Sequence, residues 1–193
     1  MRGKGREMRY FGKKVRLRAI ERDDLPRYVE WFADPAVSEN LSRQMPMSLA
    51  HEEQWFEENL KRPVEEQPLA IDVRRGAAKW EHIGGAGFNF IDKRNRLAEC
   101  GIFIGNRKYW DKGYGRDAME TLLRYGFDTL NLNRVQLCVM AFNQRAIHVY
   151  EKIGFVREGI QREAHFYGGR YWDMHHYSIL RREWGARYGA TKE

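Results

Sequence analysis

Apolar residues recur along this chain with two different periods, and the order of these periods predicts a mixed α/β fold. Alternating apolar and basic residues over 15–19 predict a first strand. Two amphipathic helices follow, one after Asp24 and one after Ser48, because a residue type that caps helices stands before each apolar face. The segment 35–46, with a proline at each end, is expected to be a loop between them.

Strands and helices alternate in the rest of the chain. Helical spacing predicts helices over 117–130 and 145–152, the second closed by Gly154. Apolar runs bounded by polar turns predict strands over 69–73, 82–91, 97–104, 135–141, 156–166 and 170–180. The last two strands form a hairpin that turns at Gly168 and Gly169. The predicted order is β-α-α-β-β-β-α-β-α-β-β.

The composition is typical of one globular domain. Of the 193 residues, 42% are hydrophobic and 13% aromatic, which argues against disorder. No apolar run approaches the roughly 20 residues that span a bilayer, so we expect no membrane contact. Cys100 and Cys138 lie in strand-like runs, are expected to be buried, and lack the spacing of a metal site. Without the apolar core of a signal peptide, a cytoplasmic protein is expected.

The net charge of +7 belongs to one end of the chain. Residues 1–18 contain eight of the 34 basic residues and one of the 27 acidic residues, which leaves 26 of each elsewhere. Such a segment is typical either of a solvated terminus or of a contact with ribosomes or nucleic acid, and both interpretations stay open. We expect a basic tail over 1–14, one domain over 15–182 and a C-terminal tail over 183–193.

Two glycines one residue apart, Gly113 and Gly115, stand between a predicted strand and the helix over 117–130. Glycine lets the backbone approach a ligand closely, and the first N–H groups of a helix have no partner within it. With the helix dipole, these groups can bind phosphate or pyrophosphate. Dinucleotide-binding oxidoreductases use a similar turn, but here it comes in mid-chain after several strands, with Ala118 in the place of the third glycine.

A second motif begins at Asn143 and ends with Tyr150-Glu151-Lys152-Ile153-Gly154-Phe155. Together with Gly113-Tyr114-Gly115, it resembles the GCN5-related N-acetyltransferases (GNAT superfamily). The resemblance covers residues 15–180 and favours the branch of ribosomal-protein N-terminal and spermidine acetyltransferases. It implies a mixed, mostly antiparallel central sheet flanked by helices, with acetyl-CoA bound where two central strands splay apart.

The resemblance also implies which residues bind acetyl-CoA. A glycine loop holds the pyrophosphate, a strand pairs with the pantetheine arm through its backbone, and an asparagine hydrogen-bonds the same arm. The matching positions are Lys112, Gly113, Gly115 and Arg116 in the loop, Ile102, Phe103 and Ile104 on the strand, and Asn143. Trp110 departs from the family pattern, which has Arg or Gln there. As an alternative, Asn143 is simply a helix N-cap.

Direct transfer of the acetyl group to an amine is the reaction that the resemblance implies. Tyr150 is expected to protonate or hydrogen-bond the departing thiolate, and Glu99 is the candidate general base if a bulge turns it toward the site. The alternatives are ordinary packing for Tyr150 and the opposite face of the sheet for Glu99. Cys138, with no base nearby, is expected to remain a thiol rather than to carry an acyl group. His165, His175 and His176, in the terminal hairpin, are further candidates for the base, with positions on the sheet surface as the alternative.

The acceptor amine stays open. A protein or peptide N-terminus is expected first, and a polyamine of the spermidine type or another small amine is the alternative. A polyamine would need a carboxylate-lined pocket, for which the sequence offers Glu52, Glu53, Glu57 and Glu58, unless they form the solvent face of a helix. A noncatalytic module that binds CoA or RNA is the alternative of another class. Members of the superfamily are often dimers, so a homodimer is a further hypothesis.

Overall fold

One sheet organises the chain in this computed structural model, which describes residues 10–41, 45–76 and 79–189. Within these residues, seven strands follow the order β1-β2-β3-β4-β5-β7-β6. Neighbouring strands are antiparallel except β4 and β5, which are parallel, so the mostly antiparallel mixed sheet is confirmed. The strands are β1 (Val15–Ala19), β2 (Leu69–Arg75), β3 (Lys79–Asp92), β4 (Leu97–Ile104), β5 (Arg134–Met140), β6 (Val156–Tyr167) and β7 (Arg170–Leu180).

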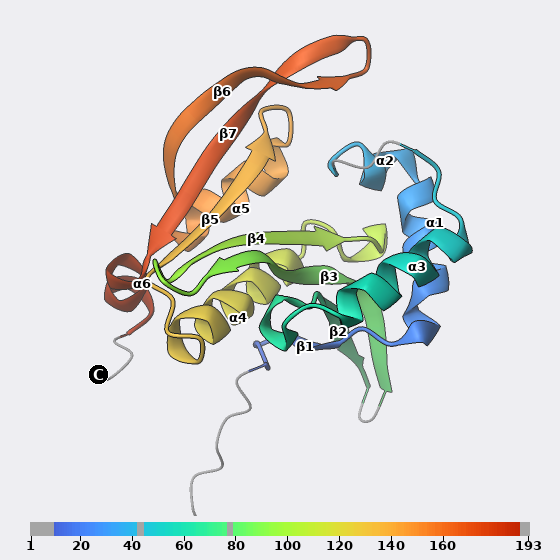
Figure 1. Ribbon diagram of the computed structural model, residues 1–193, viewed down its shortest axis with the longest axis horizontal. Coiled ribbons are helices and arrows are strands. Elements are labelled where there is room, and N and C mark those ends of the chain that lie inside the picture. Colours follow the sequence, from blue (N-terminus) through green and yellow to red (C-terminus); the bar gives the residue numbers. More distant parts are fainter. Residues whose placement is uncertain (1–9, 42–44, 77–78, 190–193) are drawn as a thin grey trace, which may run out of the picture.

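Helices cover both faces of the sheet (Figure 1). They are α1 (Leu25–Ala33), α2 (Pro35–Ser38), α3 (Leu49–Leu60), α4 (Tyr114–Asp128), α5 (Gln144–Ile153) and α6 (Arg181–Tyr188), with 3-10 turns η1 (Arg22–Asp24), η2 (Val64–Glu66) and η3 (Arg107–Tyr109). Successive strand residues point to opposite faces, so on β2 Ile71 joins the core under α4 and α5 while Ala70 joins the core under α1 and α3. None of the helices in the described segments is long and apolar enough to cross a membrane.

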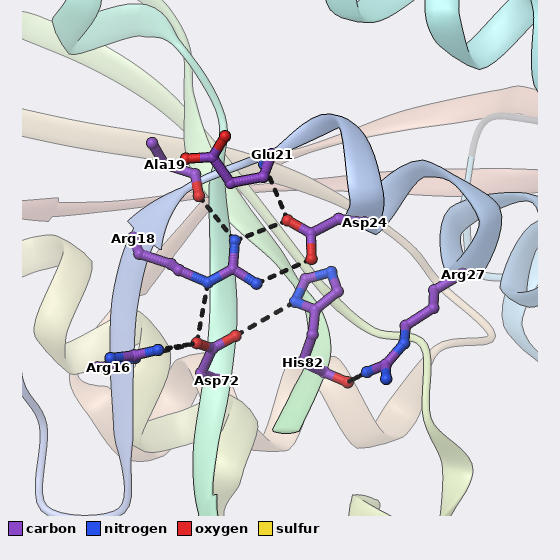
Figure 2. Close-up of polar contacts among 8 residues, drawn as sticks. All are labelled: Arg16, Arg18, Ala19, Glu21, Asp24, Arg27, Asp72 and His82. Atoms are coloured by element: carbon purple, nitrogen blue, oxygen red, sulfur yellow. Dashed lines mark hydrogen bonds and ion pairs between the residues drawn. The ribbon is translucent and has the colours of Figure 1, made fainter. Parts of the chain in front are cut away.

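An ionic cluster joins β1 and β2 to the turn before α1 (Figure 2). The Arg18 guanidinium donates to Asp24 at 2.6 and 2.8 Å and to Asp72 at 2.9 Å. Arg16 also donates to Asp72, which is almost fully buried. Burial alone would raise the pKa of Asp72, but His82 and the two guanidiniums outweigh it and hold that pKa well below its usual range. The cluster therefore fixes the start of α1 against the sheet.

The sequence predicts several element boundaries correctly and others only within a turn. The strands over 15–19 and 97–104 begin and end where expected. The helix expected at residue 117 begins three residues earlier, because Gly113, in the left-handed conformation, is its N-cap. Gly115 consequently lies in the first turn of α4 rather than in a loop before it.

Three segments have more structure than the sequence predicts. The expected loop 35–46 contains α2, whose first turn is capped by the side chain of Asp34. Residues 10–14, expected as tail, lie against α4, where the carboxylate of Asp117 accepts three of the backbone N–H groups at this end of the chain. The expected C-terminal tail begins inside α6, whose Trp184 is only 4% exposed. Buried aromatic and carboxylate groups anchor both ends, a long-range effect that local periodicity does not reveal.

The strands β4 and β5 separate after a short stretch of pairing. Residues 97–99 pair with residues 134–136, and in the described part of the chain no ladder joins the two strands beyond that point. Figure 1 shows the two strands diverging toward their carboxyl ends. Backbone groups of residues 101–104 that face β5 thus have no strand partner, as pairing with an extended ligand requires.

Candidate active site

A cavity of about 400 Å³ lies where β4 and β5 diverge. Its walls come mainly from β4, β5, α5, the start of α4 and the end of α2, with one residue each from β3, β7 and η3. Most of the candidate residues from the sequence line it, namely Glu99, Ile102, Phe103, Ile104, Gly113, Gly115, Arg116, Asn143 and Tyr150. Lys112 does not line it, and its Nζ donates to the carbonyl of Lys108 at 2.7 Å. Motifs far apart in the sequence therefore meet around one space.

The N-terminus of α4 presents free backbone N–H groups to this cavity. The first helical bond runs from the Asp117 N–H to the Gly113 carbonyl at 3.1 Å, and no side chain caps the helix. In the described chain, the four N–H groups from Gly113 to Arg116 have no hydrogen-bond partner. A Cβ added at Gly115 would meet only Ile104, at 3.6 Å, so the protein leaves room beside this backbone. Free N–H groups at the positive end of a 15-residue helix suit a phosphate or diphosphate.

Trp110, which departs from the family pattern, forms part of the wall. Its indole N–H donates to the Ile104 carbonyl at 2.7 Å. The guanidinium of Arg145 lies over the indole ring, 3.7 Å from its centre, and lines the cavity. Arg145 thus brings a positive charge to the place where the family pattern has its Arg or Gln. Arg145 is not among the residues predicted from the sequence, although its place two residues after Asn143 in the second motif was a usable signal.

Asn143 is both a helix N-cap and a residue of the cavity wall, whereas the sequence offered the N-cap as an alternative to a binding role. Its Oδ1 accepts the N–H of Ala146 at 3.1 Å, so it is the N-cap of α5. It also lines the cavity. Capping occupies the carbonyl oxygen and leaves the side-chain NH₂ as a donor, so structural and binding roles are compatible.

Tyr150 lies two helical turns further along α5. The side chain is 7% exposed, and its ring packs edge-on against Phe155 with centroids 5.8 Å apart. In the described chain the hydroxyl has no hydrogen-bond partner, although Tyr150 lines the cavity. Burial, with a smaller contribution from Cys100, raises the pKa of Tyr150 well above its usual value. The hydroxyl is therefore protonated at neutral pH and can act as a donor toward the cavity.

A bulge decides the orientation of Glu99. The ladder between β3 and β4 pairs Phe88 with Cys100 and Phe90 with Glu99, so Asn89 is the extra residue. Glu99 and Asn89 both line the cavity; Cys100 lines it too, but at 3% exposure it also belongs to the core under α4 and α5. The sequence predicted that a bulge would decide this orientation but could not locate it.

The structure corrects two expectations for Cys138, namely that it is buried and that no base lies nearby. This cysteine is exposed and lines the cavity, and its Sγ lies 3.2 Å from Nδ1 of His176 on the neighbouring strand β7. A base is therefore nearby after all. Burial, followed by the Glu99 charge, raises the pKa of Cys138, so the group is a thiol at neutral pH. Cross-strand pairing of residues 38 positions apart brings the two side chains together, and sequence spacing could not show it.

The glutamates offered for a polyamine pocket lie elsewhere. None of the four belongs to the cavity lining among the described residues. Glu52 is fully buried, Glu57 forms an ion pair with Arg22, and Glu58 bonds Lys61 at 2.6 Å. Hydrogen bonds and ion pairs within and beside α3 therefore account for much of this acidic stretch.

Comparison with known protein families identifies the family of this chain. A family model described as an acetyltransferase (GNAT) domain matches residues 14–156. The chain belongs to the GNAT acetyltransferase family. It is an N-acetyltransferase with acetyl-CoA as its acetyl donor, so the noncatalytic alternative is set aside.

Relatives of this acetyltransferase match it over most of its length. The uncharacterised N-acetyltransferase p20 of Bacillus licheniformis is 31% identical over 176 residues, which are 90% of this chain and 97% of the relative. Spermidine N(1)-acetyltransferase of Vibrio cholerae is 29% identical over 178 residues, 86% of this chain and 93% of the relative. The putative ribosomal N-acetyltransferase YdaF of Bacillus subtilis is 38% identical over 94 residues, about half of each chain.

A solved structure shares the fold at similar identity. The spermidine N-acetyltransferase from Vibrio cholerae, in complex with CoA and spermine, superimposes with a TM-score of 0.80 at 28% identity. The match covers 89% of this chain and 98% of that one.

Proposed function

We propose that this acetyltransferase transfers the acetyl group of acetyl-CoA directly to the primary amine at the N-terminus of a peptide or protein. The supporting observation is that, among the described residues, Glu99 supplies the single carboxylate where β4 and β5 separate. Asp111, the other acidic residue of the lining, lies beside Arg145 near the start of α4. One carboxylate suits an acceptor with one positive charge, and an α-amino group, with a pKa of about 8, loses its proton readily.

On the donor side, the free N–H groups at the start of α4 bind the diphosphate. Gly113 and Gly115 have no side chain that would block this backbone, and the helix dipole adds attraction for the anion. Arg116 contributes its N–H, since its guanidinium pairs with Glu120 at 2.7 Å. Residues 102–104 offer backbone groups to the pantetheine arm, and the side-chain amide of Asn143 donates to the same arm.

In the transfer step, Glu99 accepts a proton from the acceptor ammonium, and the free amine attacks the thioester carbonyl carbon. The bond between this carbon and sulfur breaks, and the electron pair leaves with the sulfur. Tyr150, protonated because burial raises its pKa, donates its proton to the departing thiolate, and the second proton of the amine nitrogen, released as the amide forms, restores the Tyr150 hydroxyl. The amide and CoA are the products, and no acyl-enzyme is required.

A polyamine is the second candidate acceptor. It is favoured by two relatives of stated substrate, the spermidine N(1)-acetyltransferases of Vibrio cholerae and Escherichia coli, which match 86% and 81% of this chain. Against it, the cavity lacks a row of carboxylates among its described lining residues.

The test is a competition between acceptors. The full chain is given acetyl-CoA with an equimolar mixture of spermidine and short peptides that have free N-termini, and the products are identified by mass spectrometry. Acetylated peptide as the main product supports the proposal, and acetylspermidine as the main product supports the second candidate. N-terminally blocked peptides without lysine are the matched control, because they lack the primary amine.

Three further predictions accompany this function. Contact of the basic N-terminus with ribosomes concerns mainly residues 1–9, which lie outside the described residues. A homodimer and a cytoplasmic location also stay predictions. Co-sedimentation with ribosomes and analytical ultracentrifugation test the first two.

A further inference from the structure

The N-terminal basic segment is fastened to the helix that begins at the proposed diphosphate site. Asp117, in the first turn of α4, accepts the backbone N–H of Lys13 at 3.0 Å, of Lys14 at 2.7 Å and of Val15 at 3.0 Å. The Asp117 side chain is largely buried by this contact. Arg124, further along α4, donates to the carbonyl of Phe11 at 3.1 Å. Residues 11–15 are thus held in place along α4.

This attachment brings the Lys14 ammonium to the glycine turn. Its Nζ donates to the carbonyl of Lys112 at 2.7 Å and lies 5.4 Å from the centre of the Tyr114 ring. A Cβ added at Gly113 would lie 3.4 Å from the same Nζ. The ammonium therefore rests against the three residues that lead into α4.

The hydrogen bond to Lys112 fixes the orientation of one peptide group. In a trans peptide, the C=O and the following N–H point in opposite directions. Because the Lys112 carbonyl points to Lys14, the N–H of Gly113 points away from Lys14. That N–H has no hydrogen-bond partner in the described chain, and Gly113 lines the cavity. A peptide next to glycine rotates at little cost, so its orientation needs an external contact.

We propose that Lys14 is a positioning residue for acetyl-CoA. It holds the peptide between Lys112 and Gly113 so that the Gly113 N–H faces the diphosphate. The inference rests on the proposed function, and it gives one residue of the basic segment a defined role in donor binding. Lys14 lies outside both sequence motifs and does not line the cavity, so it acts through the peptide rather than by contact with the reacting atoms.

Lys13 provides a matched control. It is the neighbouring residue, has the same charge, and its backbone N–H bonds the same carboxylate. Its side chain donates no hydrogen bond to the 112–114 turn in the described chain. Lys13→Met and Lys14→Met remove equal charge from the same segment, and only the second removes the hydrogen bond to Lys112.

The experiment measures steady-state kinetics of the full chain with two acetyl donors and the amine that it acetylates best. S-acetylpantetheine keeps the thioester and the arm of acetyl-CoA but has no diphosphate. Lys14→Met should raise the KM for acetyl-CoA roughly tenfold with kcat changed by less than about twofold, the pattern of lost binding energy. Its kcat/KM for S-acetylpantetheine should equal that of the unmodified protein. Lys14→Arg, which keeps a donor within reach, should recover most of the affinity.

Two kinetic results would overturn the inference. One is equal KM values for acetyl-CoA in the Lys13 and Lys14 variants. The other is an equal loss with both donors, which would indicate a general structural role. Calorimetric titration with CoA makes the same comparison without turnover, and an unchanged Kd in Lys14→Met also contradicts it. Absence of turnover by the unmodified protein with every amine would instead contradict the proposed function alone.

Discussion

The parts of the cavity proposed to bind the acetyl donor (the donor half) and the amine (the acceptor half) are built in different ways. Backbone groups dominate the donor half: the free N–H groups at the start of α4 and the edge of residues 101–104 on β4 that has no strand partner. Side chains from separate elements dominate the acceptor half, including Glu99 on β4, Cys138 on β5 and Met174 on β7. Backbone recognition requires glycines and a helix start at fixed spacing, whereas side-chain recognition requires only that the fold bring residues together. The first leaves a sequence motif, and the second does not.

The largest loss of CoA binding in the donor half is expected from a substitution of Gly113. Gly113 has φ of 80°, which a branched residue adopts only with strain, and a new side chain would also crowd the free N–H groups. We expect Gly113→Val to weaken CoA binding at least about 100-fold, the equivalent of roughly 2.7 kcal/mol. Isothermal titration with CoA measures this loss.

Gly76 provides a control that separates the effect of backbone strain on stability from the effect on CoA binding. Gly76, in the turn between β2 and β3, has a similar φ of 68°, with nothing within 4 Å of an added Cβ. Gly76→Val should lower the melting temperature of the protein about as much as Gly113→Val while CoA binding stays normal. Normal CoA affinity in Gly113→Val would contradict the assignment of this turn to the diphosphate.

A substitution of Tyr150, which lies between the two halves, should affect the transfer step and leave CoA binding nearly unchanged. Removing its hydroxyl should lower kcat roughly 100-fold, the lower end of the usual contribution of a general acid, while the Kd for CoA changes less than about twofold. Because burial raises the pKa of Tyr150, ionisation of this residue should cause no loss of activity below about pH 10. The pH profiles of kcat for the unmodified protein and Tyr150→Phe, measured with one acceptor, check both points. Unchanged turnover in the variant would remove Tyr150 from the mechanism.

The same contrast explains what the sequence could predict. The strand over 97–104, the glycine turn and the Asn143 motif are local patterns, and the structure brings them to one cavity as expected. Residues 10–14 and the part of α6 from residue 183 onward were expected as tails because their anchors, Asp117 and the buried Trp184, act across more than 50 positions of sequence. The pair Cys138–His176 depends on the register between β5 and β7. The bulge at Asn89 likewise follows from the pairing of β3 with β4, which no single segment determines.

In the acceptor half, a substitution of Glu99 tests whether this carboxylate is the general base. Glu99→Gln removes the proposed base, so the amine must arrive already deprotonated. We expect kcat/KM for the amine to fall roughly tenfold at pH 7, and the loss to shrink as the pH approaches the pKa of the amine. CoA binding should be unaffected. A loss that stays constant with pH would contradict the role of Glu99 as base.

His176→Ala makes the complementary comparison. If the imidazole beside Cys138 were the base instead, this variant, and not Glu99→Gln, would show the pH-dependent loss. Measuring both variants with the same amine therefore decides between the two groups that the fold places on the acceptor side.

The smallest effect is expected at Arg145, where a side chain contributes to the backbone-dominated donor half. Its guanidinium lies on Trp110, and its side chain is 40% exposed, so solvent weakens its attraction for an anion. We expect Arg145→Ala to raise the KM for acetyl-CoA about threefold and to leave S-acetylpantetheine kinetics unchanged. Arg107→Ala is the control, because Arg107 lies 5.6 Å from the same ring and does not line the cavity. Equal KM changes in the two variants would mean that Arg145 only packs on the indole and that the backbone N–H groups of α4 bind the diphosphate without it.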